Sequence, residues 1–258
     1  MYKILISDFE ETLIDNEDAI PLSTMLSLDK IRTTKITFGV ITNRSLKSIL
    51  DYNKDFPFVD YIIAVNGAYI YDVNKNKPIV NANVPISVIK KIKKNFDDYN
   101  LCFYTLDWCN YTKEQVSGDY VRKIGDFSVF SSFHKDNIYK MEIHCPTKKE
   151  QTNIIKKLEE LDLAIKYYAR HGKDYYVEIS SKDCDRLQAI NKICTMKKAA
   201  LKEVMMVGSN EDNIEAFKKV GMSIAVDNAS MKLKRVAKDL TGSNNEKAVE
   251  TAIKKYII

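Results

Sequence analysis

Short apolar segments alternate with segments of helical pattern at both ends of the chain, and this alternation constrains the fold more than any other feature. Near the N-terminus, the apolar segments are residues 2–7, 37–41 and 61–65, and helical pattern appears around residues 23–31 and 45–52. Strands that are connected through helices lie parallel in one sheet. The alternation therefore predicts a parallel α/β sheet with helical crossovers.

The middle of the chain has a different pattern. Residues 69–72 and 78–82 flank Asn74-Lys75-Asn76, which predicts a hairpin. The segments that follow are rich in Tyr and Phe and predict four strands and two helices. The strands are predicted at residues 101–106, 139–144, 165–169 and 175–179, and the helices at residues 86–99 and 147–161. This stretch is predicted to be an α+β unit.

From Asp183 onward the first pattern resumes, with helices predicted at residues 183–195, 211–219 and 245–257 and strands at 203–207 and 222–226. We therefore predict two domains. The core, a doubly wound and Rossmann-like parallel sheet, contains residues 1–82 and 182–258. An α+β domain of residues 83–181 interrupts it.

The bulk composition excludes several classes of protein. The 258 residues are 45% hydrophobic and 29% charged, no apolar run approaches the length of a membrane span, and residues 1–7 are too short for a signal peptide. The five cysteines are an odd number without a C-x-x-C pair, which indicates neither a disulfide framework nor a zinc site. The net charge of +5 is spread along predicted helices, which disfavours a nucleic-acid partner. A cytoplasmic protein with reduced thiols is expected.

Two carboxylates follow the first predicted strand, at Asp8 and Glu10. In an open parallel sheet, ligands bind beyond the carboxyl ends of the strands. One carboxylate there can attack phosphorus and form an aspartyl-phosphate, and a second can protonate the leaving oxygen and then activate water. For this segment alone, an acidic turn that caps a helix is the alternative interpretation.

Polar and basic residues follow two other predicted strands. Thr42, Asn43 and Arg44 come after the second strand, where a hydroxyl and backbone N–H groups form a seat for an anion, although simple N-capping is the alternative. Lys182 and Arg186 come after the interrupting domain, where a cation can neutralise phosphate charge. A cation is unfavourable at the start of a helix because of the helix dipole. A basic side chain at this position is therefore expected to have a specific anionic partner and not simply to be solvated.

A glycine-led acidic loop, residues 208–213, follows the strand at 203–207. Such a loop suits a hard cation with oxygen ligands. The alternative is a helix N-terminus whose dipole is satisfied by Glu211 and Asp212.

All three histidines lie in the interrupting domain, at His134, His144 and His171. His144 alternates with apolar neighbours and is predicted to be structural, and His171 is predicted to lie in a loop. We expect neither to be catalytic.

Taken together, these segments resemble the motifs of the haloacid dehalogenase superfamily, and in particular its Cof-type phosphatases with a large α/β (type IIB) cap. The matching segments span nearly the whole chain. In the first half, Asp8-Phe9-Glu10-Glu11-Thr12-Leu13 matches the family's D-x-D-G-T-L, Thr42-Asn43-Arg44 matches T-G-R, and Asn66-Gly67-Ala68 matches N-G-A. In the second half, residues 178–186 match E-I-x-P-K-G-x-x-K-G, residues 208–213 match G-D-x-x-N-D, and Asp227-Asn228-Ala229 matches G-N-A. The resemblance implies a Mg²⁺-dependent hydrolase of small phosphate monoesters, similar to sugar phosphates.

The resemblance also implies a role for each matching position. It makes Asp8 the nucleophile and Glu10 the general acid and base, with Thr42 and Arg186 holding the phosphoryl oxygens. The implied Mg²⁺ ligands are Asp8, the backbone carbonyl of Glu10, and Ser209 or Asp212. The implied substrate-binding residues are Asn43, Arg44, Asn66, Lys182 and Asn228.

Several positions depart from the family pattern. Glu10 and Ser209 stand where the family has Asp, Arg186 stands where it has Lys, and the Asn-Asp pair is inverted as Asp212-Asn213. Glu11 and Asn43 replace glycines, and Glu11 is strained if its φ is positive. Fewer carboxylates imply weaker binding of Mg²⁺. The alternative function is therefore a catalytically degenerate protein that binds a phosphorylated ligand without efficient turnover.

Overall fold

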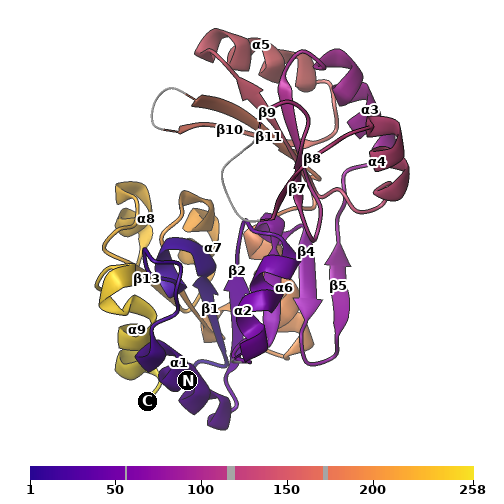
Figure 1. The fold of residues 1–258 in the computed structure, drawn as a ribbon. Helices are drawn as coiled ribbons and strands as arrows, with labels where there is room; N and C mark the ends of the chain where they lie inside the picture. The colour runs from indigo at the N-terminus through magenta and orange to yellow at the C-terminus, as the bar shows by residue number, and fades with distance from the viewer. Residues whose placement is uncertain (56, 115–119, 171–173) are drawn as a thin grey trace. The chain divides into compact units, whose positions relative to one another are not determined.

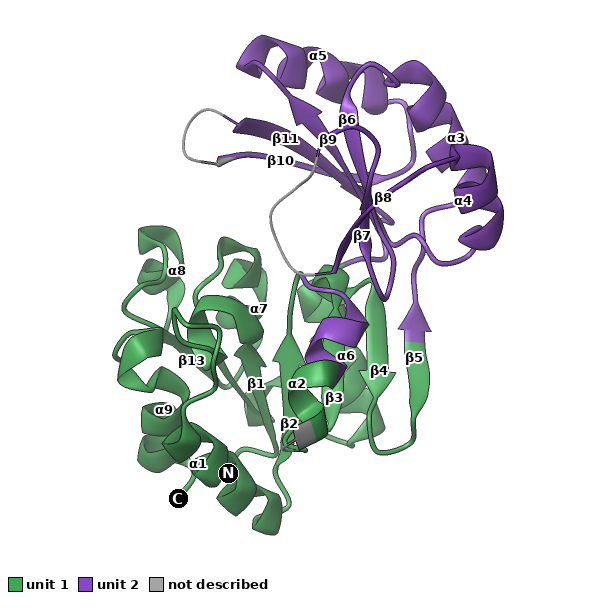
Figure 2. Ribbon diagram, in the orientation of Figure 1, with its two compact units in different colours: residues 1–43, 51–79, 185–258 green, residues 44–50, 80–184 purple. Residues whose placement is uncertain are grey.

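The computed structural model describes residues 1–55, 57–114, 120–170 and 174–258 (Figure 1). The chain forms two compact units, which Figure 2 shows in different colours. Unit 1 contains residues 1–43, 51–79 and 185–258, and unit 2 contains residues 44–50 and 80–184.

Unit 1 is built on a sheet with the strand order β14-β13-β12-β1-β2-β3-β4-β5. These strands are β1 (Ile4–Asp8), β2 (Thr37–Ile41), β3 (Tyr61–Ala64), β4 (Tyr69–Asp72), β5 (Lys77–Asn81), β12 (Val204–Gly208), β13 (Met222–Ala225) and β14 (Asp239–Leu240). The strands from β14 to β3 are parallel, and β4 is antiparallel to β3. Every residue of β1, β2, β3 and β12 is buried, as expected for strands that are covered on both faces.

Among the described residues, the α-helices that belong wholly or partly to unit 1 are α1 (Leu22–Thr33), α2 (Leu46–Asp55), α6 (Arg186–Met196), α7 (Ile214–Lys219), α8 (Met231–Val236) and α9 (Ala248–Tyr256). In the part of the chain that the structure describes, α1 packs against α9, and α6 packs against α7. Among the described residues, no helix combines the length and the apolar character that crossing a membrane requires.

The described part of unit 2 is a second sheet, in the order β10-β11-β9-β6-β7-β8, with three helices and residues 46–50 of α2. Its elements are α3 (Ile86–Asn95), β6 (Asn100–Tyr104), β7 (Cys109–Tyr111), β8 (Val121–Lys123), α4 (Phe127–Phe133), β9 (Lys140–Cys145), α5 (Lys148–Leu158), β10 (Ala164–Arg170) and β11 (Asp174–Ser180). In the hydrophobic core of unit 2, alternate residues of the strands, such as Met141 and Ile143 of β9, pack with Ile89 of α3 and Ile154 of α5. One face of this sheet therefore packs on helices.

The intervening residues of β9 form a buried charged cluster. Lys140 and Glu142 are only 4% and 2% exposed, and the Lys140 ammonium lies 3.1 Å from Glu142 and 3.4 Å from Glu178. The hydroxyls of Tyr104 and Tyr168 donate hydrogen bonds to the Glu142 carboxylate at 2.6 and 2.9 Å. We call these five residues the β9 charge cluster.

The predicted fold class is confirmed, since a parallel core sheet and a second α+β sheet are both present. Several short elements were not predicted, namely β7, β8, α4, α8 and β14. The strands among them are two or three residues long, so their sequence carries no period that distinguishes a strand from a loop. The segment 211–219, predicted as one helix, begins with a 3₁₀ turn (Glu211–Asn213) before α7.

Candidate functional site

Three polar segments of unit 1 follow neighbouring strands at the carboxyl edge of the sheet. Asp8 ends β1, Thr42 follows β2, and Ser209 follows β12. Because β1 lies between β2 and β12 in parallel register, these three residues are brought to one place. This edge is where ligands bind in open α/β sheets.

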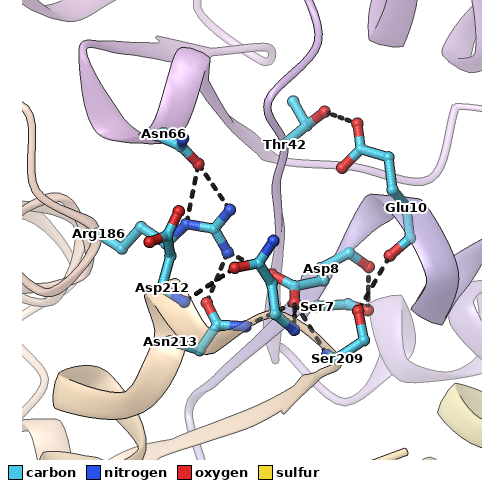
Figure 3. Close-up of polar contacts among 10 residues, drawn as sticks. Ser7, Asp8, Glu10, Thr42, Asn66, Arg186, Ser209, Asp212 and Asn213 are labelled. Atoms are coloured by element: carbon cyan, nitrogen blue, oxygen red, sulfur yellow. Dashed lines mark hydrogen bonds and ion pairs between the residues drawn. The ribbon is translucent and has the colours of Figure 1, made fainter. Parts of the chain in front are cut away.

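The Asp8 carboxylate is at the centre of the network drawn in Figure 3, and the side chain is buried. Its Oδ1 accepts a hydrogen bond from Nη1 of Arg186 at 2.8 Å. Its Oδ2 accepts from the backbone N–H groups of Ser209 and Asn210, at 3.0 and 3.3 Å, and from Nδ2 of Asn213 at 2.5 Å. Four donors therefore fix the orientation of this carboxylate.

Arg186 is the first residue of α6 and is only 5% exposed. Its Nη1 also donates to Oδ1 of Asn213 at 2.7 Å, and its Nε and Nη2 donate to Oδ1 of Asn66 at 3.1 and 2.6 Å. A cation is unfavourable at a helix N-terminus, and the ion pair with Asp8 offsets that cost. The expectation of a specific partner for a cation at this position is met by Asp8.

The loop that carries Asn66 is held in an unusual backbone conformation. Val65, Asn66 and Gly67 all have positive φ, at 48°, 57° and 102°. A Cβ on Gly67 would lie 2.9 Å from the carbonyl oxygen of Asp185, so only glycine allows this loop to approach the start of α6 so closely. The approach places the Asn66 amide against Arg186.

Asn213 has a defined amide orientation, because its two ends face different partners. Its oxygen accepts from Arg186, and its nitrogen donates to Asp8. Gly208 makes room for this contact: a Cβ there would lie 2.6 Å from Nδ2 of Asn213 and 2.8 Å from Oδ2 of Asp8. The sequence did not lead us to include Asn213 among the site residues. The signal was its place in the inverted Asp212-Asn213 pair, at the position of the family's last Asp.

Glu10 and Thr42 form a second contact of the site. The hydroxyl of the fully buried Thr42 donates a short hydrogen bond to Oε1 of Glu10. Glu11, the next residue, has a φ of 53°, so the expected strain at this replaced glycine is confirmed. Asn228 supports the same loop, since its amide nitrogen donates to the Glu11 carbonyl at 2.9 Å and its oxygen accepts from the backbone of Asn244 at 3.0 Å.

The remaining predicted residues are not among the side chains that hold Asp8 and Arg186 in the hydrogen bonds given above. Asn43 follows Thr42 in unit 1 and is not among the described residues with positive φ. Arg44 and Lys182 belong to unit 2, where Lys182 forms an exposed ion pair with Asp162. His171 lies outside the described residues.

The other two histidines have aromatic neighbours. The ring of His144 packs edge-on against Tyr176 with centroids 4.3 Å apart, and the ring of His134 lies 4.7 Å from that of Phe130.

The groups near Asp8 that could act as ligands of a divalent cation are a hydroxyl, a backbone carbonyl and carboxylates. The hydroxyl of Ser209 lies 3.5 Å from the carbonyl oxygen of Glu10, and the Glu10 carboxylate is bonded to Thr42. The backbone N–H of Asp212 donates to Asn210 at 2.8 Å. Within the described ranges, no three His, Cys, Asp or Glu side chains gather so that they could hold a metal ion. Mg²⁺ is usually held by one or two carboxylates, and the central carboxylate here, Asp8, is already paired with Arg186, so these residues do not fit a tightly held Mg²⁺.

Comparisons with known proteins agree with this geometry. Residues 5–253 match a family model described as haloacid dehalogenase-like hydrolase. The chain is 24% identical to a phosphoglycolate phosphatase of Sulfolobus acidocaldarius, over 100% of this chain and 97% of that protein. It is 19% identical to a 5-amino-6-(5-phospho-D-ribitylamino)uracil phosphatase of Bacillus subtilis, over 99% and 96%. A subclass IIB sugar phosphatase of known structure aligns with a TM-score of 0.77 and 17% identity, over 98% of each chain.

Proposed function

The chain belongs to the haloacid dehalogenase-like hydrolases, and from that premise we propose that it is a phosphatase that hydrolyses small phosphate monoesters through an aspartyl-phosphate. One observation carries the proposal: the buried Asp8 carboxylate is fixed by four donors at the carboxyl edge of the sheet. A carboxylate held in one orientation suits nucleophilic attack, because part of the entropy of alignment is lost on folding rather than in the reaction.

The two oxygens of Asp8 have different surroundings. Oδ2 accepts three N–H groups, whereas Oδ1 accepts one hydrogen bond from Arg186. We assign the attack to Oδ1, which keeps a lone pair for phosphorus. The bond between Oδ1 and phosphorus forms as the bond from phosphorus to the ester oxygen breaks. Arg186 stabilises the charge on the phosphoryl oxygens, and Thr42 joins it when a phosphoryl oxygen replaces Glu10 as the acceptor of its single O–H.

Glu10 is assigned the proton transfers. Its carboxyl group gives a proton to the leaving oxygen in the first step. In the second step its carboxylate takes a proton from water, and the water oxygen attacks phosphorus and releases phosphate from Asp8. The hydrogen bond from Thr42 orients Glu10.

Mg²⁺ is implied by the family resemblance and would polarise a phosphoryl oxygen if it were bound. Because the residues present do not fit it, no step above depends on it.

The comparisons support a substrate class within the small phosphate monoesters. Relatives that act on phosphoglycolate and on phosphorylated ribityl and sugar compounds support a small polyhydroxy or carboxylate leaving group.

The experiment is a panel of small phosphate esters, including sugar phosphates and an aryl phosphate, with the Asp8→Asn variant as control. We expect turnover by the wild type and none by Asp8→Asn. The proposal is wrong if no ester is hydrolysed faster by the wild type than by the control.

Binding of a phosphorylated ligand without turnover is the second candidate. It is favoured by the hydrogen bond between Thr42 and Glu10, which engages two groups that hydrolysis requires. This candidate predicts that phosphate esters raise the unfolding temperature without being consumed. Several turnovers per protein molecule would exclude it.

A further inference from the structure

The Asp8 carboxylate accepts hydrogen bonds from four protein donors. We infer that this site binds the phosphate group without a resident divalent cation, with Arg186 neutralising the phosphate charge and the N–H donors holding Asp8 in place of the ion. The inference rests on the proposed function, because it concerns the same phosphate-binding site.

The first argument is the charge of the buried network. Asp8 contributes one negative charge and Arg186 one positive charge, and both side chains are at least 95% buried. The other side chains bonded to them, Asn66 and Asn213, are neutral. Mg²⁺ is usually held by one or two carboxylates together with substrate phosphates. The one carboxylate at the centre of this network already has a buried counter-ion.

The second argument is the use of the Asp8 lone pairs. An ionised carboxylate offers about four lone-pair sites, or two for each oxygen. Oδ2 already accepts from Ser209, Asn210 and Asn213, so a cation at this oxygen must displace at least one donor. The two backbone donors are fixed by the chain, which leaves Asn213 as the group that must move.

The third argument is that Asn213 cannot turn its oxygen toward a cation without a cost. A flip of the amide would place its NH₂ group against Nη1 of Arg186, which is also a donor. Both of the present hydrogen bonds, to Asp8 and to Arg186, would be lost. Leaving buried polar groups unpaired is unfavourable, so the observed orientation opposes a metal at Oδ2.

Arg186 retains capacity for an anion. A guanidinium has five N–H donors, and the described contacts use Nε, both hydrogens of Nη1 and one hydrogen of Nη2. The remaining Nη2 hydrogen is available to a phosphoryl oxygen. A charge-assisted hydrogen bond of this kind is roughly twice as strong as a neutral one.

The test measures binding of inorganic phosphate to the full chain by calorimetry, in excess EDTA and in excess MgCl₂. We expect the two dissociation constants to differ by less than about threefold. Binding that requires Mg²⁺, or no binding in either buffer, would overturn the inference. Turnover of the ester panel is scored separately, so the inference and the proposed function can fail independently.

A second measurement does not depend on a phosphate ligand. The EPR signal of free Mn²⁺ falls when the ion binds to protein. We expect the wild type to leave this signal unchanged and the Ser209→Asp/Asn213→Asp double variant, which restores two carboxylates, to lower it. Thermal unfolding checks that the double variant is folded. Loss of the Mn²⁺ signal with the wild type at a stoichiometry of one, abolished by Asp8→Asn, would contradict the inference.

Discussion

At the scale of single residues, the site depends on side chains that each have more than one partner. Arg186 bonds to Asp8, Asn213 and Asn66, so its position is fixed from three directions. A lysine has a single nitrogen and cannot contact three side chains in the same fork geometry. The arginine at the position of the family's lysine is therefore accompanied by an amide at position 213, where the family has Asp, while Asn66 belongs to the family pattern.

Removing the Arg186 guanidinium should destabilise the fold strongly. In Arg186→Met the Asp8 charge remains buried without its counter-ion, and breaking a buried pair in this way costs about 3–5 kcal/mol. The control is Arg235→Met, since Arg235 is an exposed arginine of α8. Urea unfolding followed by circular dichroism compares the two variants. Equal losses of unfolding free energy in the two variants would show that the Asp8–Arg186 pair does not cause the destabilisation.

The strain at Glu11 should be relieved by glycine. Left-handed backbone costs an L-residue about 1–2 kcal/mol, whereas glycine tolerates it and loses about 0.5–1 kcal/mol through its greater freedom when unfolded. We expect Glu11→Gly to raise the free energy of unfolding by up to about 1 kcal/mol. Glu17→Gly, at an exposed residue that is not among those with positive φ, should lower it. A loss of stability in both variants would count against strain at Glu11.

At the scale of elements, the site is assembled where strands become loops under steric restriction. The loop after β3 needs glycine at position 67 to approach α6, and the end of β12 needs glycine at position 208 to let Asn213 reach Asp8. Neither position contributes a side chain to the chemistry. Their role is to let two backbone segments approach each other closely enough for the amides to reach the charged pair.

A methyl group at position 208 should disturb the site. The added Cβ of Gly208→Ala would lie within 3 Å of both Asp8 and Asn213, so the Asn213–Asp8 hydrogen bond must lengthen or break. Overpacking of this kind costs about 1–3 kcal/mol. Gly125→Ala is the matched control, because a Cβ there meets nothing within 4 Å. The prediction is that hydrolysis and thermal stability fall in the first variant only, as measured by the ester assay and calorimetry.

At the scale of the whole molecule, the two units have different kinds of interior. Unit 1 buries its sheet between helices, and its central charges are the Asp8–Arg186 pair. Unit 2 has an apolar core on one face of its sheet and the β9 charge cluster among the strand residues that alternate with that core. The pH dependence of stability should therefore differ between the units.

The Glu142 carboxylate should make the stability of unit 2 sensitive to acid. Burial by itself would raise the pKa of Glu142, but the Lys140 ammonium and the tyrosine hydroxyls hold it below its ordinary value of 4.5. A lowered pKa of an acid contributes stability that is complete above about 4.5 and is lost as the pH falls through the folded-state pKa. Unit 2 should therefore become less stable below this pH.

The single tryptophan, Trp108, lies in unit 2 and reports its unfolding by fluorescence. Below about pH 4.5, we expect the unfolding midpoint reported by Trp108 fluorescence to fall as the pH falls. In Glu142→Gln, the plot of this midpoint against pH should have a smaller slope. Glu160→Gln, at an exposed residue of the same unit, is the control and should keep the wild-type slope. An unchanged slope in Glu142→Gln would assign the acid sensitivity to other groups.

The sequence by itself determined the order of the main elements and the strand ends where polar residues gather. Strands 37–41 and 69–72 were predicted with the bounds that β2 and β4 have, because apolar strands next to turn residues carry a local signal. Asp8 and Thr42 were selected because the carboxyl ends of parallel strands meet at one edge. The family resemblance, and not the strand pattern, assigned Arg186 and Ser209 to the same site.

Only the tertiary structure decided how these residues interact. The amide orientation of Asn213 depends on Asp8 and Arg186, which lie 205 and 27 residues away in the chain. The burial of Lys140 and Glu142 depends on partners from three other strands, Tyr104 of β6, Tyr168 of β10 and Glu178 of β11. Hydrogen bonding and burial are set by partners distant in sequence, so a local pattern cannot specify them.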